Sequence, residues 1–268
     1  MDLFSIIVLG LVQGITEWIP ISSKTQVTFI YLQFLGGCPS LVIPILLYAH
    51  IGTLLAATIY FRKEVQEILK SILCCPFNYK TYTDGKNGFL IAALFFTGLV
   101  GFPILYAEKM LFPGLRGTSI FLLMGTGLIL TSLLLLSQKK LQLRSSESVD
   151  WKDGIFTGLL QGLSTLPGIS RAGTTSTALI WRSFDSESAF RLSFLLSIPS
   201  VVMAEIVFYI ASPVGSLPTM DGLSIAISSF VFGYLSLDII LNFVKRVNIA
   251  YLAMLLGALI IIAAYYQN

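Results

Sequence analysis

Long apolar runs separated by short polar stretches make up most of the chain. Each run approaches or reaches the roughly 20 residues that a helix needs to cross the hydrocarbon core of a bilayer. Six such runs occupy residues 41–61, 89–106, 119–137, 192–212, 223–241 and 249–266. The pattern predicts an all-α polytopic membrane protein in which these runs form the spanning helices.

Two more apolar segments, 1–34 and 151–181, are interrupted by proline and glycine. Without a gap, GLVQGITEWIPIS at 10–22 aligns with GLLQGLSTLPGIS at 158–170, 148 positions further along. Broken hydrophobic segments at matching positions of two halves are typical of an inverted repeat with a ligand site inside the membrane. We therefore expect each segment to form a re-entrant helical hairpin with functional groups at its tip.

Composition and charge agree with this topology. The chain is 55% hydrophobic and 12% charged, whereas roughly a quarter of the residues are charged in ordinary soluble domains. If both hairpins leave the membrane on the side they entered, thirteen of the 17 Lys and Arg residues share one face and two lie on the other. If the second broken segment crossed fully, the split would fall to nine against six. The positive-inside rule therefore favours the hairpins and makes the face with thirteen Lys and Arg residues cytoplasmic. This face comprises the segments 62–88, 138–152, 182–191 and 242–248.

A single membrane domain, 1–268, is expected to hold two units inserted in opposite senses. The first repeat comprises residues 1–137, and its hairpin, 1–34, opens to the outside. The second repeat comprises residues 151–268, and its hairpin, 151–181, opens to the inside. A cytoplasmic linker, 138–150, joins the two repeats. Each unit adds three spanning helices to its hairpin. The net charge of +3 reflects the cytoplasmic loops and gives no reason to expect a nucleic-acid partner.

The first hairpin tip combines a carboxylate with hydroxyl groups. Gln13 and Glu17 are four residues apart, so a helix would place them on one face. Pro20 would end that helix, and Ser22 or Ser23 can cap the one that follows. Ionisable groups at membrane depth are costly and usually face a functional cavity. A role for Glu17 as a mere ion-pair partner of a nearby cation is the competing interpretation.

The second tip, residues 167–175, has the features of an anion site. Glycines let backbone amides approach a ligand, hydroxyls lie where a helix begins, and a guanidinium matches phosphate oxygens. These groups are Gly168, Ser170, Arg171, Gly173, Thr174 and Thr175. Small residues also permit close helix packing in membranes, which would explain the glycines and hydroxyls but not Arg171 in the same place.

The pairing of these two tips resembles the undecaprenyl-diphosphate phosphatase family, the integral-membrane bacitracin-resistance phosphatases. That family pairs a Glu/Gln-x-x-x-Glu segment and Pro-x-Ser-Ser with a later Pro-Gly-x-Ser-Arg-x-Gly-x-Thr. The matching residues are Gln13, Glu17, Pro20, Ser22 and Ser23, then Pro167, Gly168, Ser170, Arg171, Gly173 and Thr175. The motifs cover about a tenth of the chain and fall on both predicted hairpins.

The resemblance implies an enzyme that hydrolyses undecaprenyl (polyprenyl) diphosphate to the monophosphate and phosphate at the outer face of the cell membrane. This reaction recycles the lipid carrier for cell-envelope glycan synthesis. A divalent cation, Mg²⁺ or Ca²⁺, is expected to assist, and a homodimer is compatible with the resemblance. The alternative is a transporter or flippase for a polyprenyl phosphate, which an inverted repeat also suits.

The same resemblance suggests a role for each tip residue. Glu17, alone or through a cation shared with Gln13, would orient a water or activate Ser23. Arg171 would hold the diphosphate and stabilise charge in the transition state. The expected phosphate-binding residues are Ser22, Lys24, Gly168, Ser170, Gly173, Thr174 and Thr175.

One departure from the family concerns its histidine. The family has Ser-Ser-x-Gly-His where this chain has SSKTQ at 22–26, so Gln26 replaces a histidine that is often assigned an acid/base role. An amide does not exchange protons near neutral pH. The single histidine, His50, lies in the apolar run 41–61. The favoured interpretation is a neutral histidine hydrogen-bonded inside the bundle, because it could replace the lost residue only if its helix lines the site.

Other polar and aromatic residues in apolar surroundings receive no catalytic assignment. Glu205 and Asp238 lie inside later apolar runs, where a gate or a packing partner are both consistent with the sequence. For Trp18, Trp151 and Trp181, an interfacial aromatic belt is the ordinary explanation.

Overall fold

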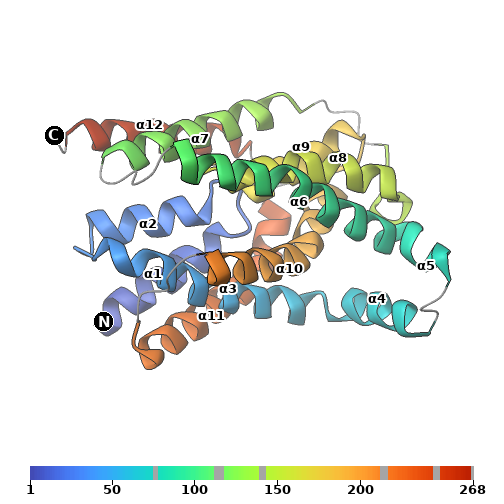
Figure 1. The fold of residues 1–268 in the computed structure, drawn as a ribbon, viewed down its shortest axis with the longest axis horizontal. Helices are drawn as coiled ribbons and strands as arrows, with labels where there is room; N and C mark the ends of the chain where they lie inside the picture. The colour runs from blue at the N-terminus through green and yellow to red at the C-terminus, as the bar shows by residue number, and fades with distance from the viewer. Residues whose placement is uncertain (75–77, 112–117, 139–142, 212–216, 244–247, 267–268) are drawn as a thin grey trace.

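The computed structural model describes residues 1–268 except 75–77, 112–117, 139–142, 212–216, 244–247 and 267–268. The described part is a bundle of α-helices (Figure 1), so the predicted all-α class is confirmed. In chain order the helices are α1 (Leu3–Thr16), α2 (Ser23–Gln33), α3 (Val42–Tyr60), α4 (Arg62–Cys74), α5 (Tyr79–Thr83), α6 (Gly85–Leu111), α7 (Thr118–Leu136), α8 (Trp151–Gly162), α9 (Arg171–Trp181), α10 (Ser186–Ala211), α11 (Thr219–Phe243) and α12 (Ala250–Tyr265). Short 3-10 turns lie at Pro39–Leu41, Ser146–Ser148 and Leu163–Thr165.

Within the described residues, five helices are long and apolar enough to cross a membrane. These candidate spans are Pro39–Tyr60, Gly85–Ala107, Thr118–Leu136, Ser186–Val207 and Thr219–Phe243. The sixth predicted run forms α12, a 16-residue helix, which is shorter than the roughly 20 residues of a typical span. A multi-pass membrane protein is therefore the architecture, as the hydrophobic pattern predicts.

Both broken segments fold as helical hairpins. Helix α1 packs against α2, and α8 packs against α9, with the irregular turns 17–22 and 163–170 at their tips. The first hairpin lies toward the end of the bundle that holds the N-terminus and the end of α12, and the second lies toward the end that holds α4 and α5 (Figure 1). The hairpins therefore enter the bundle from opposite ends and meet inside it.

The helix contacts follow the order expected of two inverted units. Helix α8 packs along α6 of the first unit, and its counterpart α1 packs along α11 of the second. Helices α7 and α12, which end the two units, pack against each other. These exchanges between halves support the predicted repeat, whose boundaries at 137 and 151 stay a prediction.

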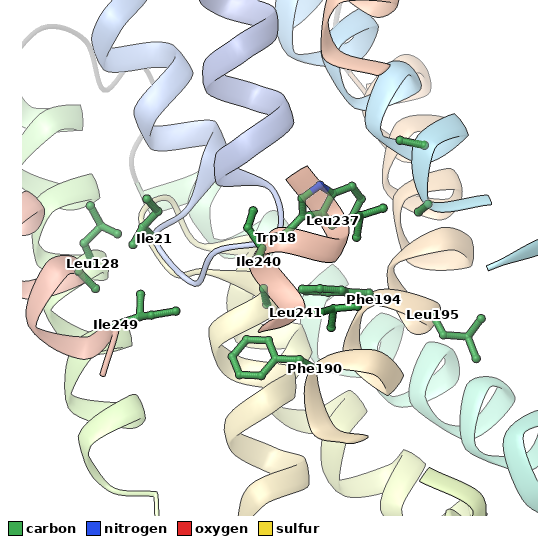
Figure 2. Packing of buried hydrophobic residues seen from close by; sticks show 14 of the residues in the cluster. Trp18, Ile21, Leu128, Phe190, Phe194, Leu195, Leu237, Ile240, Leu241 and Ile249 are labelled. Carbon is green, nitrogen blue, oxygen red and sulfur yellow. The ribbon is translucent and has the colours of Figure 1, made fainter. Parts of the chain in front are cut away.

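The main hydrophobic core surrounds the first hairpin tip (Figure 2). Trp18 is 1% exposed, its ring centroid lies 5.4 Å from that of Phe194, and its Nε1 donates to the carbonyl oxygen of Gly233 at 3.1 Å. The interfacial interpretation of Trp18 is therefore wrong. Because Trp18 follows Glu17 directly, burial of its large ring fixes the end of the hairpin against α10 and α11.

A buried ion-pair cluster holds the base of the second hairpin. The fully buried Asp153 of α8 accepts from Nη2 of Arg144 and from Nε of Arg182, each at 2.7 Å. Arg144 belongs to the linker between the two units, and Arg182 directly follows α9. Both arms of the hairpin and the linker are thus tied to one carboxylate.

The topology can be tested with reporter fusions. Reporters placed within 62–88 or 138–152 should report a cytoplasmic location, and reporters within 107–117 or 213–221 an external one, because of the distribution of Lys and Arg. Parts of these loops lie outside the described residues. An external reporter within 183–191, combined with a cytoplasmic one in 138–152, would contradict the second hairpin and the inverted repeat.

Candidate functional site

The two hairpin tips share one cavity in the interior of the bundle. Glu17 directly follows α1, and Arg171 is the first residue of α9. Both line a cavity of about 140 Å³, together with residues of α3, α6 and α10. The fold thus brings together two charged groups that are 154 positions apart in the chain.

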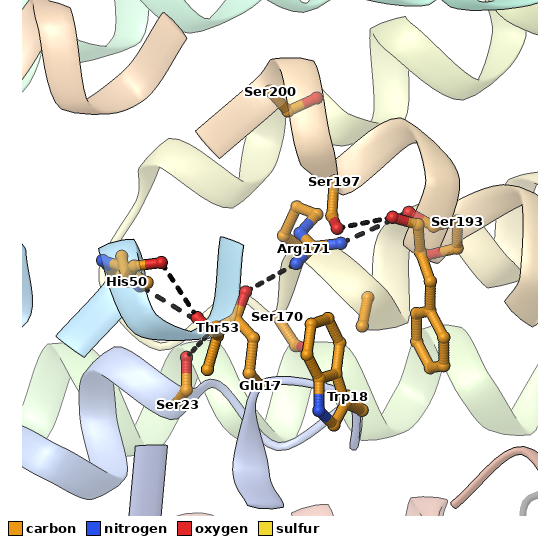
Figure 3. A network of polar contacts seen from close by, with 12 residues as sticks. Glu17, Trp18, Ser23, His50, Thr53, Ser170, Arg171, Ser193, Ser197 and Ser200 are labelled. Atoms are coloured by element: carbon orange, nitrogen blue, oxygen red, sulfur yellow. Dashed lines mark hydrogen bonds and ion pairs between the residues drawn. The ribbon is translucent and has the colours of Figure 1, made fainter. Parts of the chain in front are cut away.

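Glu17 is the centre of the polar network in this cavity (Figure 3). Its Oε1 accepts from Nη2 of Arg171 at 2.6 Å. Its Oε2 accepts from Oγ of Ser23 at 2.6 Å and from Nε2 of Gln13 at 2.9 Å. The Glu17 side chain is 7% exposed, and a buried carboxylate is tolerated only when it is paired and hydrogen-bonded.

Arg171 is fixed from a second direction as well. Its Nη1 donates to the carbonyl oxygen of Ser193 on α10 at 3.3 Å. A guanidinium carries five N–H donors in one plane, so these two contacts define the orientation of that plane at the cavity wall. The planar fork suits a phosphate group, whose oxygens it can bind in pairs.

The turn after Glu17 has an unusual backbone. Ser22 has φ 59°, in the left-handed region, which costs a non-glycine residue on the order of 1–3 kcal/mol and is found most often at functional sites. The Ser22 hydroxyl pairs with Oγ1 of Thr25 at 3.0 Å and makes no capping bond to the backbone of α2. Gln26 donates from Nε2 to the carbonyl oxygen of Ile21 at 2.9 Å. Gln26 therefore supports the turn from behind and does not line the cavity.

The two glycines of the second tip serve helix packing. Gly168 has φ 89°, and a Cβ there would lie 2.1 Å from the carbonyl oxygen of Met124 on α7. A Cβ on Gly173 would lie 2.7 Å from Cγ2 of Thr131, also on α7. Neither glycine lines the cavity, so the close-packing interpretation accounts for both.

The hydroxyl groups of the second tip divide into two sets. Ser170 lines the cavity and caps α9, because its Oγ accepts from the backbone N–H of Gly173 at 3.2 Å. Thr174 and Thr175 donate from Oγ1 to the carbonyl oxygen of Arg171, at 3.0 and 2.9 Å. These threonines stabilise the first turn of α9 and lie behind the cavity wall.

Helix α3 also lines the cavity, which brings His50 into the site. Nε2 of His50 lies 3.7 Å from Oε2 of Glu17, and its Nδ1 lies 3.1 Å from Oε1 of Glu205 on α10. The His50 side chain is 8% exposed. The condition under which His50 could replace the histidine missing at position 26 is therefore met. A carboxylate on one side and the Glu17 network on the other would orient its ring for proton transfer.

Glu205 is the residue that sequence reasoning missed. An ionisable group in the run 192–212 was a signal of function, but nothing in the sequence indicated which way α10 turns it. Asp238, the other such residue, instead accepts from the Tyr60 hydroxyl at 3.0 Å and does not line the cavity. Lys24, together with Ser22 and Ser23, does line it, as expected of phosphate-binding residues.

The site offers a divalent cation a small set of oxygen ligands. Gln13 turns its Nε2 to Glu17, and among the described residues its buried Oε1 has no hydrogen-bond partner. Within the described part of the chain, no group of three or more His, Cys, Asp or Glu residues gathers as a metal cage. Gln13 is fully buried and does not line the cavity, so its role is to hold Glu17, and the cavity wall offers the Glu17 carboxylate. This suits Mg²⁺, which proteins commonly bind through one or two carboxylates plus substrate phosphates.

These features define a class of protein: a polytopic helical membrane protein in which two helical hairpins meet at a buried cavity lined by an ion pair and hydroxyl groups. The chain belongs to the family described as bacitracin resistance protein BacA, whose model matches residues 6–262.

Several relatives match the chain over most of its length. It is 35% identical to the undecaprenyl-diphosphatase of Methanococcoides burtonii over 272 residues, which cover 99% of each chain. It is 35% identical over 243 residues to that of Haloarcula marismortui, covering 90% of this chain and 89% of the relative. The protein of the same name from Sulfurisphaera tokodaii is 34% identical over 277 residues, with 98% of each chain covered.

The predicted role of Arg171 in binding an oxyanion can be tested by binding. Arg171→Ala should weaken the binding of farnesyl diphosphate at least tenfold in isothermal titration calorimetry, because a charge-assisted, bidentate contact is lost. Arg171→Lys should recover little of this loss, since an ammonium cannot reproduce the planar fork.

The lysine variant is also the control for folding, because it keeps a cation beside Glu17. Lys152→Ala, at an exposed position of α8, should leave the affinity unchanged. Near-normal affinity in both Arg171 variants would place the diphosphate elsewhere.

Proposed function

We propose that this protein is an undecaprenyl-diphosphate phosphatase of the cell membrane. It hydrolyses undecaprenyl diphosphate, or a closely similar polyprenyl diphosphate, to the monophosphate and inorganic phosphate, and so returns the lipid carrier for cell-envelope glycan synthesis. The observation that carries the proposal is the contact of Arg171 with Glu17 and of Glu17 with Ser23, in one cavity between two hairpin tips. Family membership and the shared name of the relatives support the substrate class.

Arg171 provides the electrostatic part of the mechanism. A diphosphate that enters the cavity presents oxygens to the guanidinium, which is preorganised by the carbonyl oxygen of Ser193. The cap by Ser170 keeps the N-terminus of α9 at the cavity wall, where the positive end of the helix dipole favours phosphate. Such preorganised donors stabilise the charge that develops on the transferring phosphoryl group.

Glu17 provides the proton acceptor. Its Oε2 already accepts the Ser23 hydroxyl proton at 2.6 Å, so the proton of an attacking oxygen, from Ser23 or from a water, passes to this atom. His50 lies beside the same oxygen and, held at Nδ1 by Glu205, is placed to carry the proton onward. Together these groups would perform the acid/base work that Gln26 cannot.

A divalent cation, Mg²⁺ or Ca²⁺, is proposed to be held by Glu17 together with phosphate oxygens of the substrate, while Gln13, the second expected ligand, donates to Glu17 from outside the cavity. When bound, it would neutralise part of the charge on the diphosphate.

The position of the cavity along the bundle supports an active site that opens outward. The cavity-lining residues of α6 lie from the middle of the helix toward its end, Thr97–Leu105, and those of α10 lie in the second half, Ser200–Val207. Figure 1 shows α4 and α5 at the end where α6 begins. Since the Lys and Arg pattern makes that end cytoplasmic, the site lies nearer to the external face. The homodimer stays a prediction.

The activity is tested by phosphate release from farnesyl diphosphate with purified protein in detergent. Turnover that EDTA abolishes and Mg²⁺ or Ca²⁺ restores is the expected result. Binding without turnover in the presence of either cation would overturn the hydrolase and indicate a polyprenyl-phosphate carrier.

The proton-transfer residues give a second prediction. Glu17→Gln should lower kcat by about 10²–10⁴-fold while substrate binding persists, because the amide keeps the shape but is no base. His50→Gln should lower kcat at least tenfold with little change in KM. Asp238→Asn, a matched change of a carboxylate in a later apolar helix, should leave both constants near normal. An active Glu17→Gln variant would show that the base lies elsewhere.

A further inference from the structure

The cavity continues from the charged tips into an apolar arm between two spanning helices. Helix α6 contributes Gly98, Gly101, Phe102 and Leu105 to its lining, and α10 contributes Val201, Met203, Ala204 and Val207. These positions present apolar surface or bare glycine backbone. The polar lining residues of the same two helices are engaged elsewhere: Thr97 and Ser200 accept from Nε2 of Gln161 on α8, and Glu205 pairs with His50. Inorganic phosphate has no apolar group that could contact this lining.

The inverted repeat supplies an internal comparison for this pair of helices. By chain order, α6 and α10 correspond to α11 and α3 in the other half. Helices α3 and α11 pack along each other closely, and a Cβ on Gly52 of α3 would lie 2.2 Å from the carbonyl oxygen of Ala226 on α11. Helices α6 and α10 touch far less. Among the described residues, a Cβ on Gly98 would come within 4 Å only of the Phe102 ring on its own helix.

A physical cause for the opening lies in the two helices themselves. Each carries an internal proline near the level of the cavity, Pro103 in α6 and Pro199 in α10. Proline removes one intrahelical hydrogen bond and kinks the helix. No proline lies within α11, and Pro44 of α3 lies in the first turn of that helix, where proline is tolerated.

We propose that the gap between α6 and α10 is the lateral portal through which the isoprenoid chain of the substrate leaves the active site and enters the bilayer. The proposal rests on the proposed function and adds the route of the chain. The isoprenoid chain is the expected occupant because it is bonded to the diphosphate, and the residues that would hold the diphosphate line the same cavity as the apolar residues of α6 and α10.

The outer side of the portal fits the same occupant. Next to the lining residues, Phe95 and Leu99 on α6 and Val202 and Ile206 on α10 are exposed apolar side chains. In a membrane such side chains face hydrocarbon. A chain emerging between the helices would therefore pass from one apolar environment to another without crossing a polar barrier.

The test compares substrates that share the head group but differ in the chain. Ala204→Trp should narrow the portal, since Ala204 lines the cavity and tryptophan is much larger. Hydrolysis of undecaprenyl diphosphate should fall at least tenfold in kcat/KM, while that of dimethylallyl diphosphate, whose five-carbon chain needs no portal, should change less than threefold. Leu105→Trp on the opposite wall should give the same pattern.

Ile227→Trp is the matched control, because Ile227 lies on another spanning helix, α11, is 64% exposed and does not line the cavity. It should hydrolyse both substrates normally. Equal losses on both substrates, or normal turnover of undecaprenyl diphosphate in both portal variants, would overturn the portal and leave the phosphatase standing. Failure of the unmodified protein to hydrolyse either substrate would instead overturn the proposed function.

Discussion

The ion pair between Glu17 and Arg171 is the interaction on which the arrangement of the two hairpins depends. Their side chains are only 7% and 16% exposed, and neither charge could be buried alone, because the desolvation penalty of an isolated buried ion is several kcal/mol. Each hairpin supplies one partner. The second tip therefore stabilises the charged end of the first inside the bundle, and the two halves of the site depend on each other.

The same ion pair explains how a site built for an anion persists without one. In the structure, the Glu17 carboxylate accepts a hydrogen bond from Nη2 of Arg171, the donor to which a phosphate oxygen would bind. Binding of the diphosphate would exchange one anionic partner of the guanidinium for another, so no bare cation is exposed at any stage. The exchange would also free Oε1 of Glu17 from its counterion, while Oε2 keeps its contact with Ser23.

Much of this arrangement could be predicted from the sequence, because local rules determine it. The repeated broken motif and the Lys and Arg asymmetry predicted two hairpins, and their tips predicted that Glu17, Ser23 and Arg171 would meet. What could not be predicted depends on helix rotation. The apolar runs that contain His50 and Glu205 carry no pattern that says which side faces the site. Only packing of α3 and α10 against the tips decides it, and the same packing buries Trp18.

The alignment of the two tips also shows why they had to diverge. In the gapless alignment, Glu17 corresponds to Thr165 and Arg171 to Ser23, and all four residues line the same cavity. Had both tips kept a glutamate, or both an arginine, two like charges would face each other where water is scarce, and their repulsion would be strong at low dielectric. A carboxylate on one tip and a guanidinium on the other turn this repulsion into attraction. The two counterparts, Thr165 and Ser23, are neutral and line the same cavity. Inverted symmetry thus builds the cavity, and the loss of symmetry at these positions gives it a base on one side and a phosphate-binding group on the other.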